Sequence, residues 1–252
     1  MINFLKKDLQ RAFSDRGFIV ATIFLTVILI RAIILNSRFD GTMSSYEIIL
    51  NAMAVSGFSP FAAVFPCIGY SNRFCDENTT NYNLFIKTRM GLKKYISVRM
   101  FTVGVSGGMV IAIPFCIVCS IAYMFGSSGV DGIQLFQPYQ ETLMEHYIIQ
   151  YGDFFFASVK VLLGFLFGVL WAEVSLAVAL ISGSKYVASI IPFLIYECMW
   201  IGLQKYPLWN PIYLYRGDSI GNFFLSGIIL TLYIIIVIVF IKIIVWRKIN
   251  DR

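Results

Sequence analysis

The sequence predicts an all-α integral membrane protein with six transmembrane helices. Of its 252 residues, 58% are hydrophobic and only 13% are charged, whereas soluble domains contain about 45–50% apolar and about 25% charged residues. A bilayer-crossing helix needs about 20 mostly apolar residues. Because lipid offers the backbone no hydrogen-bond partners, each apolar segment of that length is expected to be a helix. These segments are residues 18–35, 48–70, 101–125, 154–181, 187–203 and 223–245.

Prolines interrupt three of the six segments. Pro60 and Pro66 lie in the second, Pro114 in the third and Pro192 in the fifth. Proline removes a backbone donor and its ring clashes with the preceding helical turn. We therefore expect these helices to be kinked at the prolines.

The N-terminal segment, residues 1–17, is predicted to be an amphipathic helix in the inner membrane interface. Its apolar residues recur at spacings of three and four, and basic residues occupy the opposite face. Ser14, Asp15 and Gly17 end the helix before the first span. The segment is either a simple topogenic anchor or an elbow helix that borders a partner protein. Residues 18–252 form a single transmembrane domain.

The Lys and Arg residues are distributed unevenly between the two sides. If the N-terminus is cytoplasmic, fourteen of the twenty lie on the inner side, three lie outside and three fall within spans. This bias predicts that both termini are cytoplasmic in a multi-pass protein of the cell membrane. The net charge of +6 therefore indicates topology and attraction to anionic lipid, and it does not indicate nucleic-acid binding.

One inner loop, residues 73–99, is long, basic and patterned. Its beginning, Asp-Glu-Asn-Thr-Thr from Asp76, supplies residues that cap and favour a helix N-terminus. Residues 82–90 can then form about two helical turns before Gly91 ends them. The other inner loop, residues 183–186, is only a tight connection. The inner face thus has one loop long enough to dock a partner.

The two longer outer loops have different compositions. Residues 126–153 contain four acidic residues and no Lys or Arg, and residues 134–149 have the periodicity of a short surface helix. Residues 204–222 are rich in aromatic residues that suit the membrane interface. This second loop either lies in the interfacial belt or dips back into the membrane as two half-helices.

Patterns that carry catalytic chemistry are weak. Residues 104–108 match the G-x-S-x-G nucleophile motif around Ser106, but they lie in a membrane helix and the only histidine, His146, lies in an outer loop. Close helix packing through this stretch and through residues 164–168 is the favoured interpretation. No G-x-x-x-x-G-K-[ST] loop is present. The sequence therefore offers no catalytic, cofactor-binding or metal-binding residues.

Ionisable residues at membrane depth usually pair with one another or line an aqueous path. We expect Glu197, near the middle of the fifth span, to pair with Lys160 or Arg31 as a structural clamp. A substrate pathway past these side chains is the alternative. The full set is Arg31, Lys160, Glu173 and Glu197, with Lys242 able to snorkel to the inner interface.

The layout resembles that of the permease subunits of type 2 ABC exporters. Six spans, an amphipathic N-terminal helix and a long first inner loop carry the resemblance, together with Glu77, residues 83–99 and the aromatic, proline-containing stretch 207–215. The resemblance implies that residues 82–90 are a cytoplasmic coupling helix that docks into an ATPase subunit. It implies the following docking residues: Glu77, Tyr82, Leu84, Phe85, Lys87, Arg89, Met90 and Lys185.

The resemblance also implies partners. Two permease subunits, identical or different, would assemble with two copies of an ABC ATPase, and ATP and Mg²⁺ would be held by the ATPase. This chain would be a transport subunit without enzymatic activity of its own. Compact permeases of this size resemble exporters of peptides, including bacteriocins and lantibiotics, or of hydrophobic drugs.

Two other classes remain open from the sequence. A gradient-driven secondary transporter or channel would work without an ATPase. A membrane-embedded enzyme would depend on Ser106, Glu197 or His146.

Overall fold

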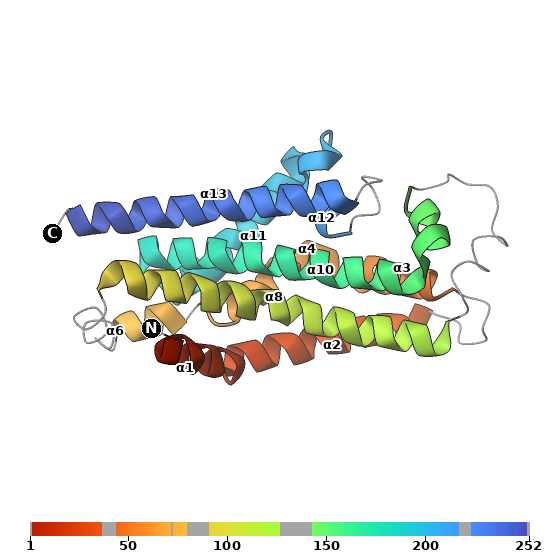
Figure 1. Ribbon diagram of the computed structural model, residues 1–252, viewed down its shortest axis with the longest axis horizontal. Coiled ribbons are helices and arrows are strands. Elements are labelled where there is room, and N and C mark those ends of the chain that lie inside the picture. Colours follow the sequence, from red (N-terminus) through yellow and green to blue (C-terminus); the bar gives the residue numbers. More distant parts are fainter. Residues whose placement is uncertain are drawn as a thin grey trace.

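Every regular element formed by the described residues is a helix. The structure, a computed structural model, describes residues 2–36, 44–71, 73–79, 91–126, 143–216 and 223–250. The longer helices run side by side along one axis, with α1, α6 and the C-terminal end of α13 at one end of the bundle and α3 at the other (Figure 1). The elements are α1 (Ile2–Phe13), α2 (Arg16–Asn36), α3 (Ser45–Val55), α4 (Phe58–Phe61), α5 (Val64–Ile68), α6 (Arg73–Thr79), α8 (Leu92–Phe125), α10 (Leu143–Ser182), α11 (Lys185–Gly202), η1 (Pro207–Trp209), α12 (Pro211–Arg216) and α13 (Phe223–Asn250).

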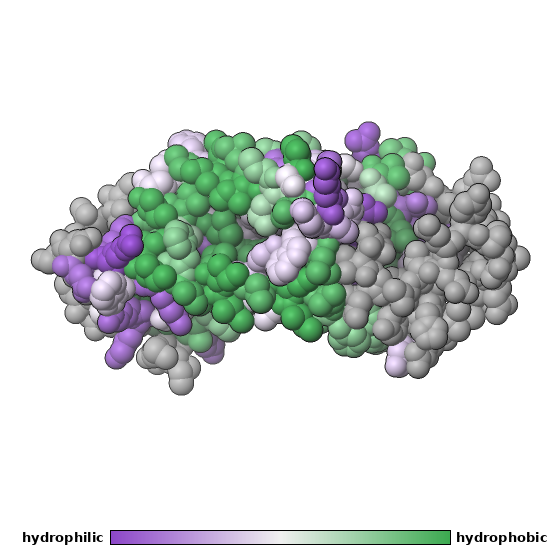
Figure 2. Space-filling model, turned by 90° about the horizontal axis from the view of Figure 1, so that it is seen from above, coloured by the Kyte–Doolittle hydropathy of each residue, from purple (hydrophilic) through white to green (hydrophobic). Residues whose placement is uncertain are grey.

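Four described helices are long and apolar enough to cross a membrane, which indicates a membrane-embedded protein. These are the stretches Arg16–Leu35, Leu92–Phe125, Tyr151–Ser182 and Phe223–Lys248. They correspond to the first, third, fourth and sixth predicted spans. A fifth candidate is a bent helix pair that covers the second predicted span. Hydrophobic side chains cover most of the middle of the face seen from the side of α13, and hydrophilic ones gather where α13 ends (Figure 2).

The second predicted span is broken, where the sequence analysis expected one helix with kinks at its prolines. Ser44 starts α3 with a capping box to Glu47. The chain then bends by 62° between α3 and the segment from α4 onward. The break lies at Ser56–Gly57, and Gly57 has a φ of 68°. The Pro60 ring would clash with the carbonyl four residues earlier, at Ser56, so the break precedes the proline.

The third span extends further than predicted. Helix α8 begins at Leu92 and runs without a described break through the basic stretch that was assigned to the inner loop. Lys93 and Lys94 are exposed on this extension, whereas Tyr95 and Arg99 are buried. The loop ahead of α8 therefore ends at Gly91, where a φ of 76° favours glycine.

Helix α10 joins the predicted outer surface helix to the fourth span. Residues 143–151 are helical and continue into the span across Gly152, whose φ of 78° produces a kink. In Figure 1 the first turns of α10 stand away from the bundle axis. Residues 143–151 are therefore the first part of α10, and the fourth predicted span follows them after the kink.

The backbones of helices α8 and α10 pack closely against each other at their glycine residues. A Cβ atom added to Gly168 would lie 2.4 Å from the carbonyl oxygen of Gly107, and one added to Gly107 would lie 2.3 Å from the Cβ of Ala172. Only glycine lets two backbones approach this closely. The predicted packing role of the glycine-containing stretches is confirmed. Ser106 is buried and its hydroxyl donates to the carbonyl of Val103 in its own helix.

The segment after α11 turns back into the bundle. Helix α12 has four buried residues and packs against α10, α11 and α13. The Tyr215 hydroxyl donates to the Ser59 hydroxyl at 2.7 Å, and the Tyr196 hydroxyl of α11 donates to the Ser59 carbonyl at 2.6 Å. Tyr206 and Trp209, in contrast, are exposed. The described part of this segment thus has two exposed aromatic residues followed by a short helix that packs into the bundle, and its place relative to the membrane stays a prediction.

Candidate functional site

A cluster of buried, paired charges lies at the end of the bundle that holds α1 and α6. Arg99 of α8 is 1% exposed and lies between two carboxylates, Asp8 of α1 and Glu77 of α6. The Asp8 side chain is 2% exposed and that of Glu77 is 11% exposed. One guanidinium therefore joins three helices that are distant in the sequence.

The geometry of this Arg99 cluster is tight. Arg99 Nη1 donates to Asp8 Oδ1 at 2.8 Å, and Nη2 lies 2.7 Å from Glu77 Oε2. The guanidinium also lies over the ring of Tyr70, 4.4 Å from the ring centre. Such a cation–π contact adds to the ion pairs when the cation is desolvated.

Three hydroxyl groups also donate hydrogen bonds to the two carboxylates of the cluster. Asp8 accepts hydrogen bonds from Tyr70 at 2.7 Å and from Thr102 at 2.6 Å. Glu77 accepts one from the Tyr95 hydroxyl at 2.9 Å. Buried charges are tolerated only when they are paired and hydrogen-bonded in this way. The cluster thus attaches α1 to α8 through Asp8, which binds both Arg99 and Thr102.

Helix α6 immediately precedes residues 80–90 and forms ion pairs with three other parts of the chain. Arg73 pairs with Asp15 at 2.6 Å, and Glu77 pairs with Arg99. Asp76 pairs with Lys185, at the start of α11, at 3.5 Å. Exposed pairs such as Asp76–Lys185 contribute little stability, so the buried Glu77 contact is the principal anchor. Residues 80–90 follow immediately after this anchored helix.

Only two of the eight predicted docking residues, Glu77 and Lys185, lie in the part of the chain that the structure describes. The other six, Tyr82, Leu84, Phe85, Lys87, Arg89 and Met90, lie outside the described residues. Lys185, at the start of α11, is exposed. Glu77 was predicted to be a charged docking anchor, but it points inward to Arg99 and Tyr95. Glu77 thus pairs inside the bundle, and its role in docking stays a prediction.

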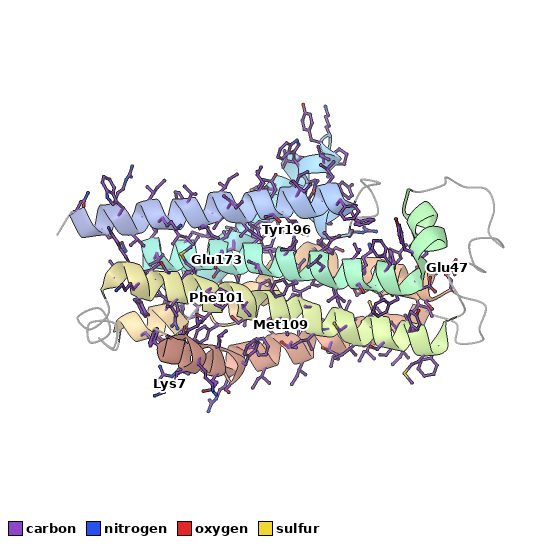
Figure 3. All side chains as sticks on the ribbon, in the orientation of Figure 1. Lys7, Glu47, Phe101, Met109, Glu173 and Tyr196 are labelled. Atoms are coloured by element: carbon purple, nitrogen blue, oxygen red, sulfur yellow. The ribbon has the colours of Figure 1, made fainter. Side chains whose placement is uncertain are left out.

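The Arg99 cluster is not predicted by the sequence patterns described above, although one signal points to it. Asp8 lies three residues after Leu5 and four before Ala12, on the apolar face of the N-terminal helix. An acidic residue on such a face indicates a buried basic partner. The basic face was predicted correctly, since Lys6, Lys7, Gln10 and Arg11 are exposed. Lys7 points away from the bundle (Figure 3).

The charges at membrane depth do not form the expected clamp. Lys160 is fully buried; its amine donates to the carbonyl oxygen of Arg216 and lies 5.1 Å from the centre of the Phe156 ring. Among the described residues, no ion pair joins Glu197 to Lys160 or Arg31. Tyr196 turns into the core to reach Ser59, and the neighbouring Glu197 is consequently rotated about 100° around the helix from that direction.

Glu173 lies deep in the α8–α10 contact. Its side chain is 3% exposed, and a Cβ at Gly104 would lie 2.9 Å from its Oε1 atom. Its Oε2 atom has no hydrogen-bond partner within the described part of the chain. Glycine at position 104 therefore makes the space that this carboxyl group occupies.

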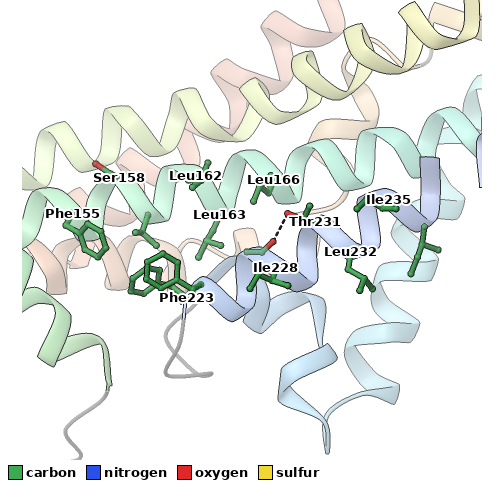
Figure 4. Close-up of a pocket in the computed structure, with 14 residues that line it drawn as sticks. Phe155, Ser158, Leu162, Leu163, Leu166, Phe223, Ile228, Thr231, Leu232 and Ile235 are labelled. Atoms are coloured by element: carbon green, nitrogen blue, oxygen red, sulfur yellow. Dashed lines mark hydrogen bonds between the residues drawn. The ribbon is translucent and has the colours of Figure 1, made fainter. Parts of the chain in front are cut away.

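An apolar groove of about 820 Å³ lies between α10 and α13 (Figure 4). Phe155, Leu163, Phe223 and Ile228 are among its lining residues. Its two hydroxyl groups are already engaged, because Ser158 donates to the carbonyl of Phe154 and Thr231 to that of Gly227. This groove offers a ligand hydrophobic contact alone.

Comparisons with known proteins add no relative to this picture. The chain matches no model of a known protein family, no curated protein sequence and no solved structure.

Proposed function

We propose that this chain is the transmembrane permease subunit of an ATP-driven exporter of the type 2 ABC class. The observation that carries the proposal is the anchored helix α6. It is tied to Asp15, Arg99 and Lys185, and the basic loop of residues 80–90 follows it directly. A loop that continues from an anchored helix can transmit a movement of a docked ATPase to the spans that the helix contacts.

The proposal includes six crossings with both termini in the cytoplasm. Helix α1 and the C-terminal end of α13 lie at the same end of the bundle (Figure 1), which requires an even number of crossings. The four long helices and the bent pair account for five. We assign α11 as the sixth, because its 18 residues span about 27 Å, close to the roughly 30 Å of the hydrocarbon core. The excess of Lys and Arg at this end orients it inward.

The assembly that we propose has two permease subunits and two ATPase subunits. The chain has no phosphate-binding G-x-x-x-x-G-K-[ST] sequence, so the ATPase partner would hold ATP and Mg²⁺. The substrate would be a peptide or a hydrophobic small molecule that moves between the two permease subunits.

Replacing residues 82–90 with a Gly-Ser segment of equal length should abolish co-purification of the ATPase subunit. The reason is that the replacement removes the docking side chains but leaves α6 and α8 in place. The measurement is pull-down with the natural chain and with the variant, followed by identification of any bound ATPase and by ATP hydrolysis in reconstituted vesicles.

The matched control is a Gly-Ser replacement of residues 133–141 in the outer loop, which is equally long and lies on the opposite side in the proposed topology. This control should retain the ATPase. Normal binding and ATP turnover with residues 82–90 replaced would show that the docking role is wrong.

Glu173 favours a second candidate, a proton-driven transporter. A carboxyl group that is buried in a span and lacks a described partner at one oxygen is the kind of residue that carries protons in such proteins. No second described carboxylate shares its site, and this makes the candidate weaker than the ATP-driven one.

Proton flux distinguishes the two candidates. In vesicles that contain the purified chain and a trapped pH-sensitive dye, an imposed pH gradient should collapse no faster than in empty vesicles, because an ABC permease does not couple to protons. Glu173→Gln should behave in the same way, and so should Glu197→Gln, at a partly buried carboxyl group of α11. A flux in the natural chain that disappears only in Glu173→Gln would favour the proton-driven transporter.

A further inference from the structure

A second groove, of about 890 Å³, lies where the broken span meets α2. One wall is a single face of α2 that includes Val20, Phe24 and Arg31. The opposite wall begins at the Ser56–Gly57 break and continues down to Ile68. Because α3 and the following segment are bent by 62°, they do not form one straight helix against α2, and the groove occupies the space at the bend.

Arg31 is the unusual member of this groove. It is the only charged residue of α2 after Arg16, it is exposed, and it makes no hydrogen bond or ion pair within the described part of the chain. An unpaired arginine among apolar side chains in a membrane is costly. An anionic group bound at Arg31 would therefore lower the electrostatic cost of this unpaired charge.

The position of Arg31 suits a lipid headgroup. It lies five residues before Asn36, the last residue of α2, which is about 7 Å along the helix axis. A long side chain at this depth can reach the headgroup region by snorkelling. A guanidinium also binds phosphate through two parallel hydrogen bonds, which a lysine cannot do.

The remainder of the groove suits an acyl chain. From Arg31 to Val20 it follows α2 for about 16 Å, and its sides carry Phe24, Phe61 and Phe65. The hydroxyl of Ser56 is already engaged, since it donates to the carbonyl of Met53 and accepts from the N–H of Phe58. Below Arg31 the groove thus presents a hydrophobic channel next to a single cation.

We propose that this groove binds one phospholipid from the leaflet at the C-terminal end of α2, with its phosphate on Arg31 and an acyl chain along α2 toward Val20. The site does not depend on the transport function proposed above. It would place a lipid against the break in the second span, where the lipid fills the space left by the bend.

Lipid retention measured by native mass spectrometry tests the site. The purified chain in detergent is incubated with phosphatidylglycerol or with diacylglycerol of the same acyl chains, and bound molecules are counted. Phosphatidylglycerol should be retained and diacylglycerol should not. Arg31→Gln should weaken phosphatidylglycerol binding about tenfold or more, because a charge-assisted hydrogen bond is lost. The matched control Arg247→Gln, an exposed residue on α13, should leave binding unchanged.

A second pair of variants tests the channel independently of the charge. Val20→Trp, at a lining position that is 61% exposed, should displace the acyl chain and lower retention. Ile243→Trp, at an exposed position on α13 outside both grooves, should not. Circular dichroism checks that each variant keeps its helices.

Three results would overturn the proposal. The first is equal retention of phosphatidylglycerol by the natural chain and by both groove variants. The second is equal retention of diacylglycerol and phosphatidylglycerol. The third is a change in oligomeric mass with Arg31→Gln or Val20→Trp while lipid retention stays constant, because a second copy of the chain would then occupy the groove.

Discussion

Replacing Arg99 with methionine should destabilise the protein by about 3–5 kcal/mol, the cost of breaking a buried ion pair from one side. Methionine fills a similar volume but leaves the carboxylates of Asp8 and Glu77 buried without their cation. The expected fall in melting temperature is about 6–20 °C for a chain of this size. Tryptophan fluorescence during heating in a fixed detergent measures it.

The control for this prediction is Arg73→Met. Arg73 also pairs with a carboxylate, Asp15, but its side chain is 43% exposed, so the loss should stay below about 1 kcal/mol. A triple variant that adds Asp8→Asn and Glu77→Gln to Arg99→Met should recover part of the stability, because neutral amides cost less to bury than unpaired carboxylates. Equal effects of Arg99→Met and Arg73→Met would contradict the buried cluster.

Gly168→Ala should destabilise the contact between α8 and α10 by about 3 kcal/mol, at the upper end of the usual cost of overpacking. The added methyl group would lie 2.4 Å from the carbonyl oxygen of Gly107 and 2.9 Å from the Cα of Gly108. These are backbone atoms, which have no alternative rotamer, so the helices must separate. Gly107→Ala should act similarly because its Cβ would meet that of Ala172.

Gly202→Ala provides the matched control at the end of α11. Nothing lies within 4 Å of a Cβ atom at this position, so the substitution should be neutral or slightly stabilising. The Gly107→Ala and Gly168→Ala double variant should lose less stability than the sum of the single variants, because both report on one contact. Additive losses, or a loss in Gly202→Ala that equals that in Gly168→Ala, would show that the contact is not as close as described.

Hydropathy was sufficient to find four of the spans, because length and apolar composition identify a bilayer-crossing helix. It could not reveal the break at Gly57, since residues 48–70 read as one apolar segment. The prolines pointed to a distortion in that segment, but the position of the break depends on which earlier residue can adopt a left-handed backbone. Hydropathy also could not reveal that α8 begins at Leu92. A basic stretch is not apolar, but it can still continue a helix beyond the lipid.

The polar contacts between helices were harder to predict from the sequence than the membrane spans. Asp8 and Arg99 are separated by 91 residues, and a pairing over that distance has no local pattern. The pairing expected for Lys160 failed for another reason. Its amine binds the backbone carbonyl of Arg216, and backbone acceptors have no sequence signature. Docking residues 82–90 remain a prediction, since they lie outside the described part of the chain.

The Arg99 cluster also sets an order of events during synthesis. A ribosome adds roughly 5–20 residues per second, so the 91 residues between Asp8 and Arg99 take roughly 5–18 s to appear. During this interval Asp8 has neither the guanidinium nor the Thr102 hydroxyl that it binds in the finished protein. A charged carboxylate without partners stays hydrated, so we expect the N-terminal helix to remain at the membrane surface during this interval. It is made first but is held in place only after α8 has been inserted.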